Sequence, residues 1–497
     1  MRNGFTRKTS WLWQNTEKIL IILFLATFTL NIRKVFLTPY SFLNGTFNEY
    51  LTMSFSWADA LMIATIIIYT IKYIICQSKS GSSSLHETSQ GNTTKENNKG
   101  YLSSVIHCIT NASCETYFLL LFIAWCFISI IWSPYKPIAV YRCLTLLEIL
   151  LFFFIAYKNL VANSRFLRIS FVALIANGFI QAIIGILQFI YGHSLGLRLF
   201  GESIVSRETP GVAKLVIDGE KHIRAYGTFP HPNILAGFLI IPLIMILISL
   251  LNRWQPKLFF NSASSEETNQ SKLVSRATSL NQIPASLILV FLFIIGLGFI
   301  LAFSRSAFLG LFAALLFILY SFIRNLKCKK QISIVLLFII IASVGSIYFV
   351  NRNTSLFSDQ SMRERASYAN VARETISAHP LAGIGIGQFA LEEYSENPNL
   401  EGWQYQPVHN VYLLLASELG IAGLVLFLIF MATLFLGEGR GGKDDYRLTY
   451  YSFCCIILPF LVIALFDHYF WDIKTGTIIF SLIITFILLR NRNLVIN

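Results

Sequence analysis

The residue best suited to chemistry in this chain is a histidine at the end of a long polar stretch. His409 and Asn410 close the mostly polar stretch 351–410, and a strongly apolar run begins at Val411. An imidazole titrates near neutral pH, which suits a general base. The helix start that the apolar run predicts favours anions such as phosphate, and Asn410 is placed to cap it. We predict that His409 is a base; the alternative is an interfacial histidine satisfied by backbone or water.

Two arginines stand where polar loops meet apolar runs. Arg224 opens the segment Arg-Ala-Tyr-Gly-Thr-Phe-Pro-His-Pro-Asn, which ends at Asn233, and Arg305 lies in Phe-Ser-Arg-Ser-Ala between two apolar runs. An arginine so close to apolar runs costs free energy to place there unless a partner group compensates its charge. A planar guanidinium can bind phosphate through two hydrogen bonds, so two of them near His409 would form a pyrophosphate site. The alternative is that each side chain only snorkels to the interface.

Three further polar residues lie inside apolar runs, and each has a structural alternative. Arg142 and Glu148 share one run, where they either stabilise a helical bundle or contact a substrate. Glu418 lies two to three turns inside the run that begins at Val411. It is either packed against a partner or functional, and the sequence does not decide between the two.

The acidic residues do not indicate a metal site. No Asp-x-Asp sequence occurs, and Glu49 is the only acid in the stretch 33–55. Asp467, His468 and Asp472 resemble a metal cluster weakly, and an exposed turn explains them better. The eight cysteines form no Cys-x-x-Cys pair, so a zinc site is not expected either. We therefore expect chemistry without a metal or a cofactor.

The composition indicates a helical membrane protein. The 497 residues are 55% hydrophobic and their mean hydropathy is +0.61. Apolar runs of roughly 17–25 residues, long enough to cross a hydrocarbon core, recur along the chain. The expected fold is all-α, in one polytopic membrane domain over 1–497. The net charge of +13 does not indicate nucleic-acid binding, because the basic residues sit mainly in short loops.

We predict twelve membrane spans and assign each loop to a side. The spans cover about 19–37, 56–76, 115–132, 138–157, 167–190, 232–251, 285–303, 307–323, 332–350, 411–436, 449–466 and 473–489. Alternation groups the Lys- and Arg-rich loops with both termini, and basic loops face the cytoplasm. We therefore expect a multi-pass protein of the cytoplasmic (inner) membrane with both termini cytoplasmic. The polar stretches 33–55, 191–230 and 351–410 are then outside, the last as a large extracytoplasmic loop between the ninth and tenth spans.

The loops differ in what they are expected to form. The ranges 78–113 and 252–284 include stretches rich in Ser, Asn, Thr, Gln and Glu, which predict flexible cytoplasmic loops. In the large outer loop, the apolar positions from Met362 to Ile376 follow helical spacing, and Pro380 ends that helix. We expect this helix to lie over the outer face of the protein.

Four motifs resemble signatures of the O-antigen ligase and polymerase superfamily. His409-Asn410, nine residues and then Gly420 are similar to the H-[N/S/Q]-x9-G pattern of the O-antigen ligases. The other three motifs are Arg224-x-x-Gly-Thr-Phe-x-x-Pro-Asn233, Ser304-Arg305-Ser-Ala and Pro380-x-x-Gly383-x-Gly385-x-x-x-Phe389. The resemblance runs from about residue 20 to residue 485 and is strongest over 224–237, 303–310 and 363–424.

The resemblance implies a membrane glycosyltransferase of the C type with twelve helices. Such enzymes take a glycan from an undecaprenyl-pyrophosphate carrier on the outer face of the cytoplasmic membrane. The family's histidine falls on His409, as base for the acceptor hydroxyl, and its two pyrophosphate-binding arginines fall on Arg224 and Arg305. The partners implied are the lipid-linked donor, membrane lipid, and an acceptor that is a glycan, a lipid A core or a protein. We add to the expected substrate-binding residues Asn233, Asn410 and Arg142.

Several functions remain open at this point. The favoured one is an O-antigen ligase, and the alternatives within the superfamily are a polysaccharide polymerase and a protein O-oligosaccharyltransferase. Polymerase members carry arginine-rich repeats in two outer loops, which are matched only loosely by Arg198, Arg207 and Arg224 and by Arg363, Arg365 and Arg373. A flippase for lipid-linked oligosaccharides belongs to another class. It needs polar residues along a central path and no large ordered outer loop, which is the reverse of this chain.

Overall fold

The computed structural model describes residues 2–84, 113–254 except 210, 218 and 219, 284–325, 359–436 and 456–491, together with 340 and 344. This part of the chain is mainly α-helical, as predicted. Its strands form three antiparallel hairpins: β1 (Arg33–Phe36) with β4 (Met53–Ser56), β2 (Phe42–Leu43) with β3 (Thr46–Phe47), and β5 (Lys214–Ile217) with β6 (Glu220–Ile223). All three hairpins lie in the polar stretches, so the apolar runs of the described residues form helices.

Six of the described helices are long and apolar enough to cross a membrane. They are α2 (Trp57–Ser84), α4 (Cys114–Ile128, continued by the short η1, Ser129–Ile131), α5 (Lys136–Ala162), α6 (Ser164–Tyr191), α7 (Pro232–Trp254) and α14 (Val411–Leu436). Three shorter apolar helices are α9 (Ala285–Leu301), α10 (Arg305–Asn325) and α17 (Lys474–Asn491). All of them coincide with predicted spans. The predicted span 332–350 lies outside the described residues apart from 340 and 344, so the number twelve stays a prediction.

The first predicted span, 19–37, is wrong at its C-terminal end. The helix α1 (Arg2–Thr27) stops at Thr27, and residues 33–36 form β1 instead. β1 pairs with β4 in a register that sets Arg33 opposite Ser56. Arg33 also forms an ion pair with Glu49 at 2.5 Å. The pairing satisfies the backbone groups of this polar segment, which a continued helix would have carried into the apolar layer.

The two ranges predicted as cytoplasmic loops begin too early. α2 continues to Ser84, into the range 78–113, and α7 continues to Trp254, into the range 252–284. Most of the remainder of both ranges lies outside the described residues.

The helix α7 forms the centre of the bundle. In its most apolar window 83% of the residues are buried, against 17% in the corresponding window of α4. It packs against α6, α9 and α10. Its contact with α6 is close, because a Cβ on Gly178 would lie 2.6 Å from Cγ of Pro242. Since α7 begins at Pro232, the chain that leads from Arg224 to Asn233 is anchored to the most enclosed helix.

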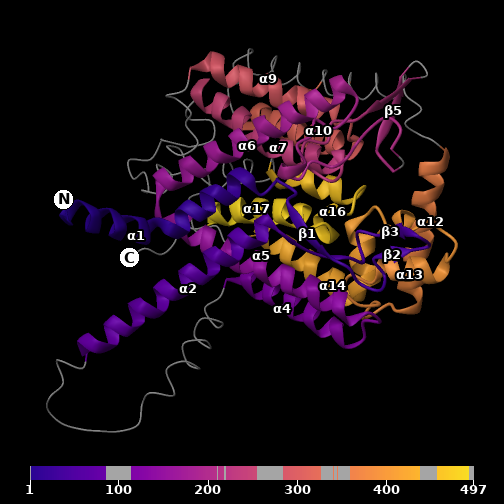
Figure 1. Ribbon diagram of the computed structural model, residues 1–497, viewed down its shortest axis with the longest axis horizontal. Coiled ribbons are helices and arrows are strands. Elements are labelled where there is room, and N and C mark those ends of the chain that lie inside the picture. Colours follow the sequence, from indigo (N-terminus) through magenta and orange to yellow (C-terminus); the bar gives the residue numbers. More distant parts are fainter. Residues whose placement is uncertain are drawn as a thin grey trace, which may run out of the picture.

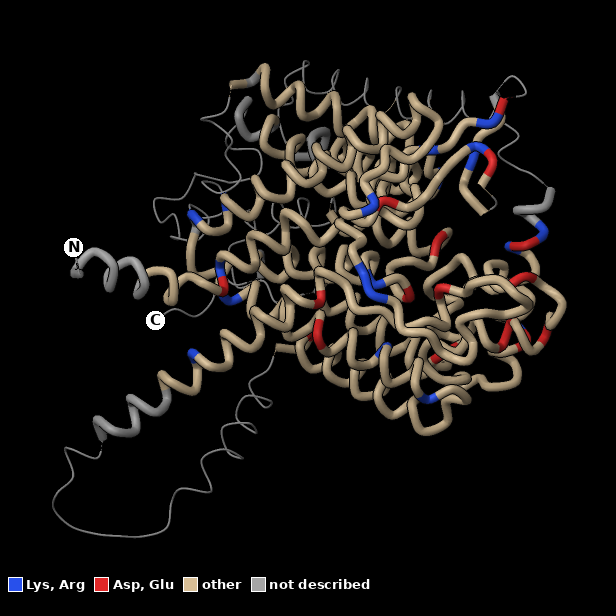
Figure 2. The backbone as a smooth tube through the Cα atoms, in the orientation of Figure 1, with Lys and Arg blue, Asp and Glu red and all other residues tan. Residues whose placement is uncertain are grey.

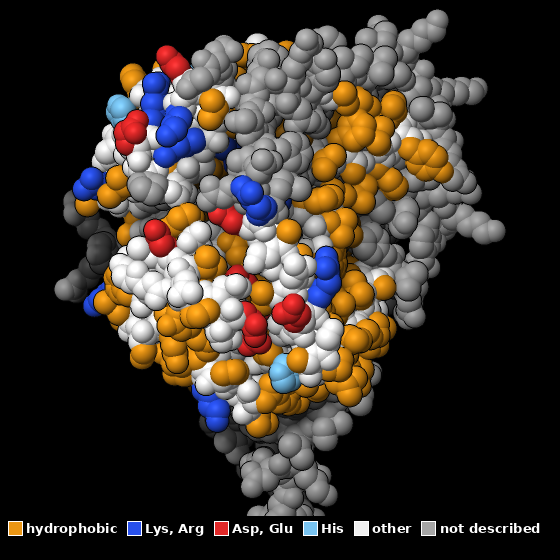
Figure 3. All heavy atoms as spheres, turned by 90° about the vertical axis from the view of Figure 1, so that its right-hand side faces the viewer, with side chains coloured by type: hydrophobic (Ala, Val, Ile, Leu, Met, Phe, Trp, Pro, Cys, Tyr) orange, Lys and Arg blue, Asp and Glu red, His pale blue; other side chains and the backbone are white. Residues whose placement is uncertain are grey.

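The two ends of the bundle differ in content. Both termini lie at one end, whereas the hairpins, α12 (Asp359–Ala378) and α13 (Phe389–Glu396) lie at the other, on the right of Figure 1. Much of the charge of the described chain is at this second end (Figure 2), and Figure 3, which faces it, shows acidic and basic side chains gathered there. The described parts of the polar stretches 33–55, 191–230 and 351–410, which are predicted to share one side of the membrane, therefore lie at the same end of the bundle. The side of the membrane that they face stays a prediction.

The helix predicted within the large loop is confirmed as α12. Its buried face carries Tyr368, Val371 and Ala372, which pack with Leu414 of α14 and Phe389 of α13. α12 ends two residues before Pro380, as its sequence predicts. It therefore lies against the start of α14, close to His409.

Glycines fasten the large loop to α14. α14 is interrupted at Gly420, whose φ is 68° and ψ is −178°. The loop 380–387 enters this break, where the backbone N–H of Gly385 donates to the carbonyl of Glu418 at 2.8 Å. A Cβ on Gly420 would lie 2.1 Å from the carbonyl oxygen of Leu381. Only a residue without a side chain fits here, so this motif glycine shapes the loop rather than taking part in chemistry.

Candidate active site

His409 lies directly before α14, between two aromatic rings. It stacks on Tyr368 of α12, with ring centroids 5.8 Å apart and 8° between the planes. Its other neighbour is His468, which it meets edge-on at 4.8 Å between centroids. Nδ1 of His409 is buried and makes no hydrogen bond of normal geometry within the described residues. The predicted base is therefore packed against a second histidine, and the backbone of Pro407 interacts with its ring.

The pKa values of the two histidines are shifted in opposite directions. Burial lowers the pKa of His409 well below its ordinary value, and the positive charges of His468 and Arg365 add to the shift. Burial also opposes charge on His468, but Asp472, with Oδ2 at 2.7 Å from Nδ1, and Asp467 outweigh it and raise the pKa of His468. Neighbouring groups whose pKa values are pushed apart can divide acid and base roles. His409 is the neutral imidazole of the pair, ready to accept a proton.

The expectation that Asp467, His468 and Asp472 mark an exposed turn is wrong. Their exposed fractions are 5%, 3% and 8%. The short helix α16 (Tyr469–Asp472) begins after His468, so a helical turn brings the imidazole and the carboxylate of Asp472 onto one face. A histidine and an aspartate four residues apart between two apolar runs are the signal in the sequence that indicates such a buried pair.

Arg224 belongs to the same hydrogen-bonded network. Its Nε donates to the carbonyl of Ala302 at 2.8 Å, and its Nη2 donates to Oδ1 of Asn233 at 2.6 Å. The amide of Asn233 donates in turn to Oδ2 of Asp467 at 2.7 Å, and Oδ1 of Asp467 accepts from the backbone N–H of His468 at 3.1 Å. Asn233, predicted to bind substrate, thus connects the arginine to the histidine pair. Burial lowers the pKa of Arg224 to about 10, which leaves the guanidinium charged at neutral pH.

Arg305 begins α10 directly after a tight turn. Phe303 in this turn has a φ of 47°, in the left-handed region that a bulky side chain rarely adopts. Arg305 lies close to the first arginine: after burial, the positive charge of Arg305 is among the influences that lower the pKa of Arg224. Ala302, which accepts the hydrogen bond of Arg224, belongs to the same turn. The turn between α9 and α10 therefore leads into Arg305 and also accepts a hydrogen bond from Arg224, while the pairing of the two arginines stays a prediction.

Three residues of the site were not assigned from the sequence. Arg365, exposed on α12, is one: together with burial, its charge lowers the pKa of both His409 and His231. Tyr368, one helical turn further on, is the second, and it carries the ring on which His409 stacks. His231, whose Nδ1 accepts from the backbone N–H of Asn233 at 3.2 Å, is the third. The spacing of Arg365 and Tyr368 on one face of a predicted helix could have indicated the first two.

Asn410 and Glu418 are occupied by structural contacts. Oδ1 of Asn410 accepts from the backbone N–H of Leu413 at 3.0 Å, and its amide donates to the carbonyl of Leu465 at 3.0 Å. It is the helix cap expected from the sequence, and substrate binding by it stays a prediction. Glu418 accepts a hydrogen bond from Nε1 of Trp471 at 2.8 Å. Glu418 therefore has a packing partner, and a functional role for it is not tested by this contact.

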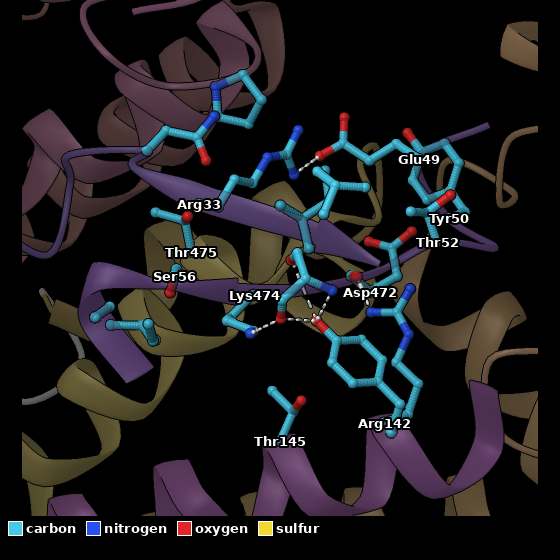
Figure 4. Close-up of a pocket in the computed structure, with 18 of the residues that line it drawn as sticks. Arg33, Glu49, Tyr50, Thr52, Ser56, Arg142, Thr145, Asp472, Lys474 and Thr475 are labelled. Atoms are coloured by element: carbon cyan, nitrogen blue, oxygen red, sulfur yellow. Dashed lines mark hydrogen bonds and ion pairs between the residues drawn. The ribbon is translucent and has the colours of Figure 1, made fainter. Parts of the chain in front are cut away.

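Arg142 lies on the side of the cluster that faces a polar recess. Its Nη1 donates to the carbonyl of Asp472, and its Nε is buried without a hydrogen-bond partner among the described residues. The recess has a volume of about 850 Å³, open space at its mouth included. Figure 4 shows Arg33, Tyr50, Arg142, Asp472 and Lys474 around it. His409, Arg224 and Arg305 do not line it.

Among the described residues, no group of three or more His, Cys, Asp and Glu side chains is placed to hold a metal ion. The acids nearest to His409 bond to protein groups instead: Asp467 to Asn233, and Asp472 to His468. Independence from metal stays a prediction.

Residues 289–428 match the family model described as O-Antigen ligase. This match supports a relationship to the O-antigen ligase and polymerase superfamily. No curated protein matches the chain. The match supports membrane glycan transfer between a lipid-linked glycan and an acceptor, by a glycosyltransferase-like enzyme.

The O-antigen ligase match covers only part of the site. It includes α9, α10, α12, α13 and most of α14, and with them Arg305 and His409. Arg224 and Asn233 lie before the matched residues, and His468 lies after them. The structure brings these flanking segments to the ligase-type histidine, so the site extends beyond the part of the chain that the family model recognises.

Proposed function

We propose that this O-antigen ligase-family protein transfers a glycan from an undecaprenyl-pyrophosphate-linked donor to an acceptor hydroxyl on the outer face of the cytoplasmic membrane. One observation carries the proposal. His409, whose pKa is lowered, contacts His468, and Arg224 is linked to His468 through Asn233 and Asp467. The charge of Arg305 acts on Arg224. This is the combination that a transfer from a pyrophosphate carrier requires.

The reaction is a single displacement at the anomeric carbon. His409 takes the proton of the acceptor hydroxyl as its oxygen bonds to that carbon. The bond from the anomeric carbon to the pyrophosphate oxygen breaks, and the electron pair leaves with the pyrophosphate. Arg224 and Arg305 stabilise the negative charge that develops there. One displacement inverts the anomeric configuration, and no step needs a metal.

His468 assists by its charge. Asp472 favours the imidazolium form of His468, and this charge next to His409 keeps the base neutral before transfer. Once His409 has taken a proton, the same repulsion favours its release. His468 is therefore a positioning residue for the proton transfer.

The polymerase and the protein O-oligosaccharyltransferase share this chemistry and differ in the acceptor. A ligase adds the glycan to a lipid A core, a polymerase to another lipid-linked glycan, and a protein transferase to a side-chain hydroxyl. The same His409, Arg224 and Arg305 would serve in each case. A flippase would have no use for a neutral histidine beside two arginines.

The test is transfer by the purified protein in lipid nanodiscs, in the presence of EDTA, from a defined undecaprenyl-pyrophosphate glycan. Lipid A core, a second lipid-linked glycan and a serine-containing peptide are offered as acceptors in parallel. We expect a product with one of them, with an inverted anomeric configuration determined by NMR. A product with retained configuration, or transfer that stops in EDTA and returns with Mg²⁺, contradicts the mechanism.

A further inference from the structure

The recess beside the histidine pair is a separate compartment with polar walls. It is built from the β1–β4 hairpin and the residues between its strands, from α5, and from the start of α17 (Figure 4). Hydroxyl groups line much of it: Tyr50, Thr52, Ser54, Ser56, Tyr141, Thr145 and Thr475. About 850 Å³ of empty space lies within the recess and its open mouth, and about 70 Å³ of it admits the centre of a water molecule.

Two of the three cations that line this recess are paired with carboxylates. Arg33 forms an ion pair with Glu49 at 2.5 Å. Lys474 forms one with Asp59 at 2.7 Å, and Asp59 is buried. The third cation, Arg142, donates to the backbone carbonyl of Asp472.

Two buried polar atoms in the recess are left without partners. Asp472 is more than nine-tenths buried, and its Oδ1 makes no hydrogen bond within the described residues. Nε of Arg142, next to it, makes none either. A buried polar group without a hydrogen bond costs free energy, so we expect each of these two atoms to bond to a ligand or a water. One atom is an acceptor and the other a donor, and both belong to residues that line the recess.

We propose that this recess binds the terminal saccharide of the acceptor, an inference that rests on the proposed function. A sugar hydroxyl both donates and accepts, so it can donate to Oδ1 of Asp472 while a hydroxyl accepts from Nε of Arg142. Phosphate would bring no donor to the carboxylate of Asp472. The ring of Tyr141, over which the ammonium of Lys474 lies at 5.3 Å, adds an aromatic wall.

The position of the recess fits the second substrate of the reaction. Arg224 reaches the histidine pair through Asn233 and Asp467. The recess reaches it by another route, through Asp472, which bonds to His468, and through Tyr50, whose ring lies 5.7 Å from that of His468. Donor and acceptor would therefore approach His409 through different neighbours. A saccharide in the recess also favours a glycan acceptor, as in a ligase or a polymerase, over a protein acceptor.

The test is to fill the recess without touching the proposed catalytic residues. Thr145→Phe on α5 and Thr475→Phe on α17 each fill it from a different wall. Leu144→Phe is the matched control, because Leu144 is the neighbouring position on α5 and is exposed on the outside of the bundle. Each filling variant should raise the KM for the acceptor about tenfold or more, with donor binding unchanged. Leu144→Phe should leave both unchanged.

A binding measurement keeps this test separate from the test of the transfer reaction. Methyl glycosides of glucose, galactose and N-acetylglucosamine are probed by saturation-transfer NMR on the full protein in nanodiscs, without donor. We expect binding of at least one glycoside by the wild type and by Leu144→Phe, lost in both filling variants and not displaced by inorganic pyrophosphate. Binding that survives the filling variants, or no binding of any glycoside by the wild type, overturns the recess as an acceptor site. Absence of transfer with intact glycoside binding instead counts against the proposed function alone.

Discussion

At the scale of single residues, the candidate site contains two histidines in contact whose pKa values are shifted in opposite directions. Burial and the positive charge of His468 lower the pKa of His409. Asp472 and Asp467 raise the pKa of His468, against the effect of burial. A base must be unprotonated before the acceptor arrives, and the lowered pKa of His409 fits this requirement. In the proposed reaction, the arginines would add positive charge on the side of the leaving group.

Replacing the base should abolish most of the transfer without unfolding the protein. For His409→Ala we expect transfer to fall by roughly 10²–10⁴, the usual loss for a general base. Membrane insertion and donor binding should persist, because the ring lies at the surface end of α14. Transfer from the lipid-linked donor is the measurement. His379→Ala, at an exposed histidine after α12, is the control and should retain full activity. Near-normal transfer by His409→Ala would make His409 structural.

The geometry of the arginines should matter beyond their charge. Arg224 uses Nε and Nη2 for protein contacts, and a lysine at this position cannot make both contacts and also bind the donor. Arg224→Lys and Arg305→Lys should each slow transfer by roughly 10–150-fold, which corresponds to about 1.5–3 kcal/mol for a charged hydrogen bond. Binding of undecaprenyl pyrophosphate should weaken in both. Arg373→Lys, at an exposed arginine of α12, should change neither quantity. Unchanged donor binding with weakened acceptor binding would show that the arginines bind the acceptor instead of the donor.

The acid limb of the pH dependence of kcat should depend on the pKa of His409 and, through it, on the charge of His468. The pKa of His409 is lowered in the folded protein, so the active neutral form persists as the pH falls below 6.5 and is lost only at lower pH. Asp472→Asn removes the carboxylate that favours charge on His468. The repulsion on His409 then weakens, and we expect the acid limb of kcat to move to higher pH while staying below 6.5, because burial remains. A limb that stays in place, or moves to lower pH, would rule out the coupling.

At the scale of elements, the position of His409 depends on how the large loop is fastened to α14. α12 lies against the first turns of α14, and the loop 380–387 hydrogen bonds into the break at Gly420. These two attachments hold the segment that presents His409 from both sides. Gly420 is part of the motif shared with O-antigen ligases, and its role in the structure is conformational.

A side chain at the break should therefore destabilise the protein. Gly420→Ala forces a Cβ to within 2.1 Å of a carbonyl oxygen at a φ of 68°, and we expect a loss of about 1–3 kcal/mol or more. Gly296→Ala is the control, because nothing lies within 4 Å of a Cβ there and a helical alanine is favoured by about 0.5–1 kcal/mol. Thermal unfolding in detergent should fall for the first variant and stay or rise for the second. Equal melting temperatures would contradict this account of the break.

At the scale of the whole molecule, the site lies at the end of the bundle away from both termini. The apolar helices make the middle, and α12, α13 and the β2–β3 hairpin lie at the end away from the termini, as Figure 1 shows. His409 stacks on Tyr368 of α12 and so belongs to this end. The histidine, the arginines and the recess come from segments spread over most of the chain. They meet because the helices return these segments to the same end.

Labelling can decide which side of the membrane this end faces. In a background without the eight native cysteines, a cysteine at Asn399, exposed beyond α13, should react in whole cells with an impermeant thiol reagent that passes the outer membrane. A cysteine at Ala162, the exposed last residue of α5, should react only after the membrane is opened. The opposite pattern would put His409 in the cytoplasm and exclude an extracytoplasmic reaction.

The sequence by itself determined the membrane class, the positions of the described apolar helices and the helix within the large loop. These follow from hydropathy and periodicity, which are properties of contiguous residues. It also indicated His409, Arg224 and Arg305, because each stands at a boundary where a polar or charged side chain is costly without a purpose.

The tertiary structure alone decided what these residues do to one another. Asn233 and Asp467 bond across 234 positions, and His409 meets His468 from a different helix. The turn 467–472 seemed exposed from its polarity, yet it is buried because a neighbouring segment covers it. Periodicity specifies which face of a helix is apolar but not which helix will cover it. The pairing of a neutral with a charged histidine, and the recess beside them, therefore depend on packing that no local pattern encodes.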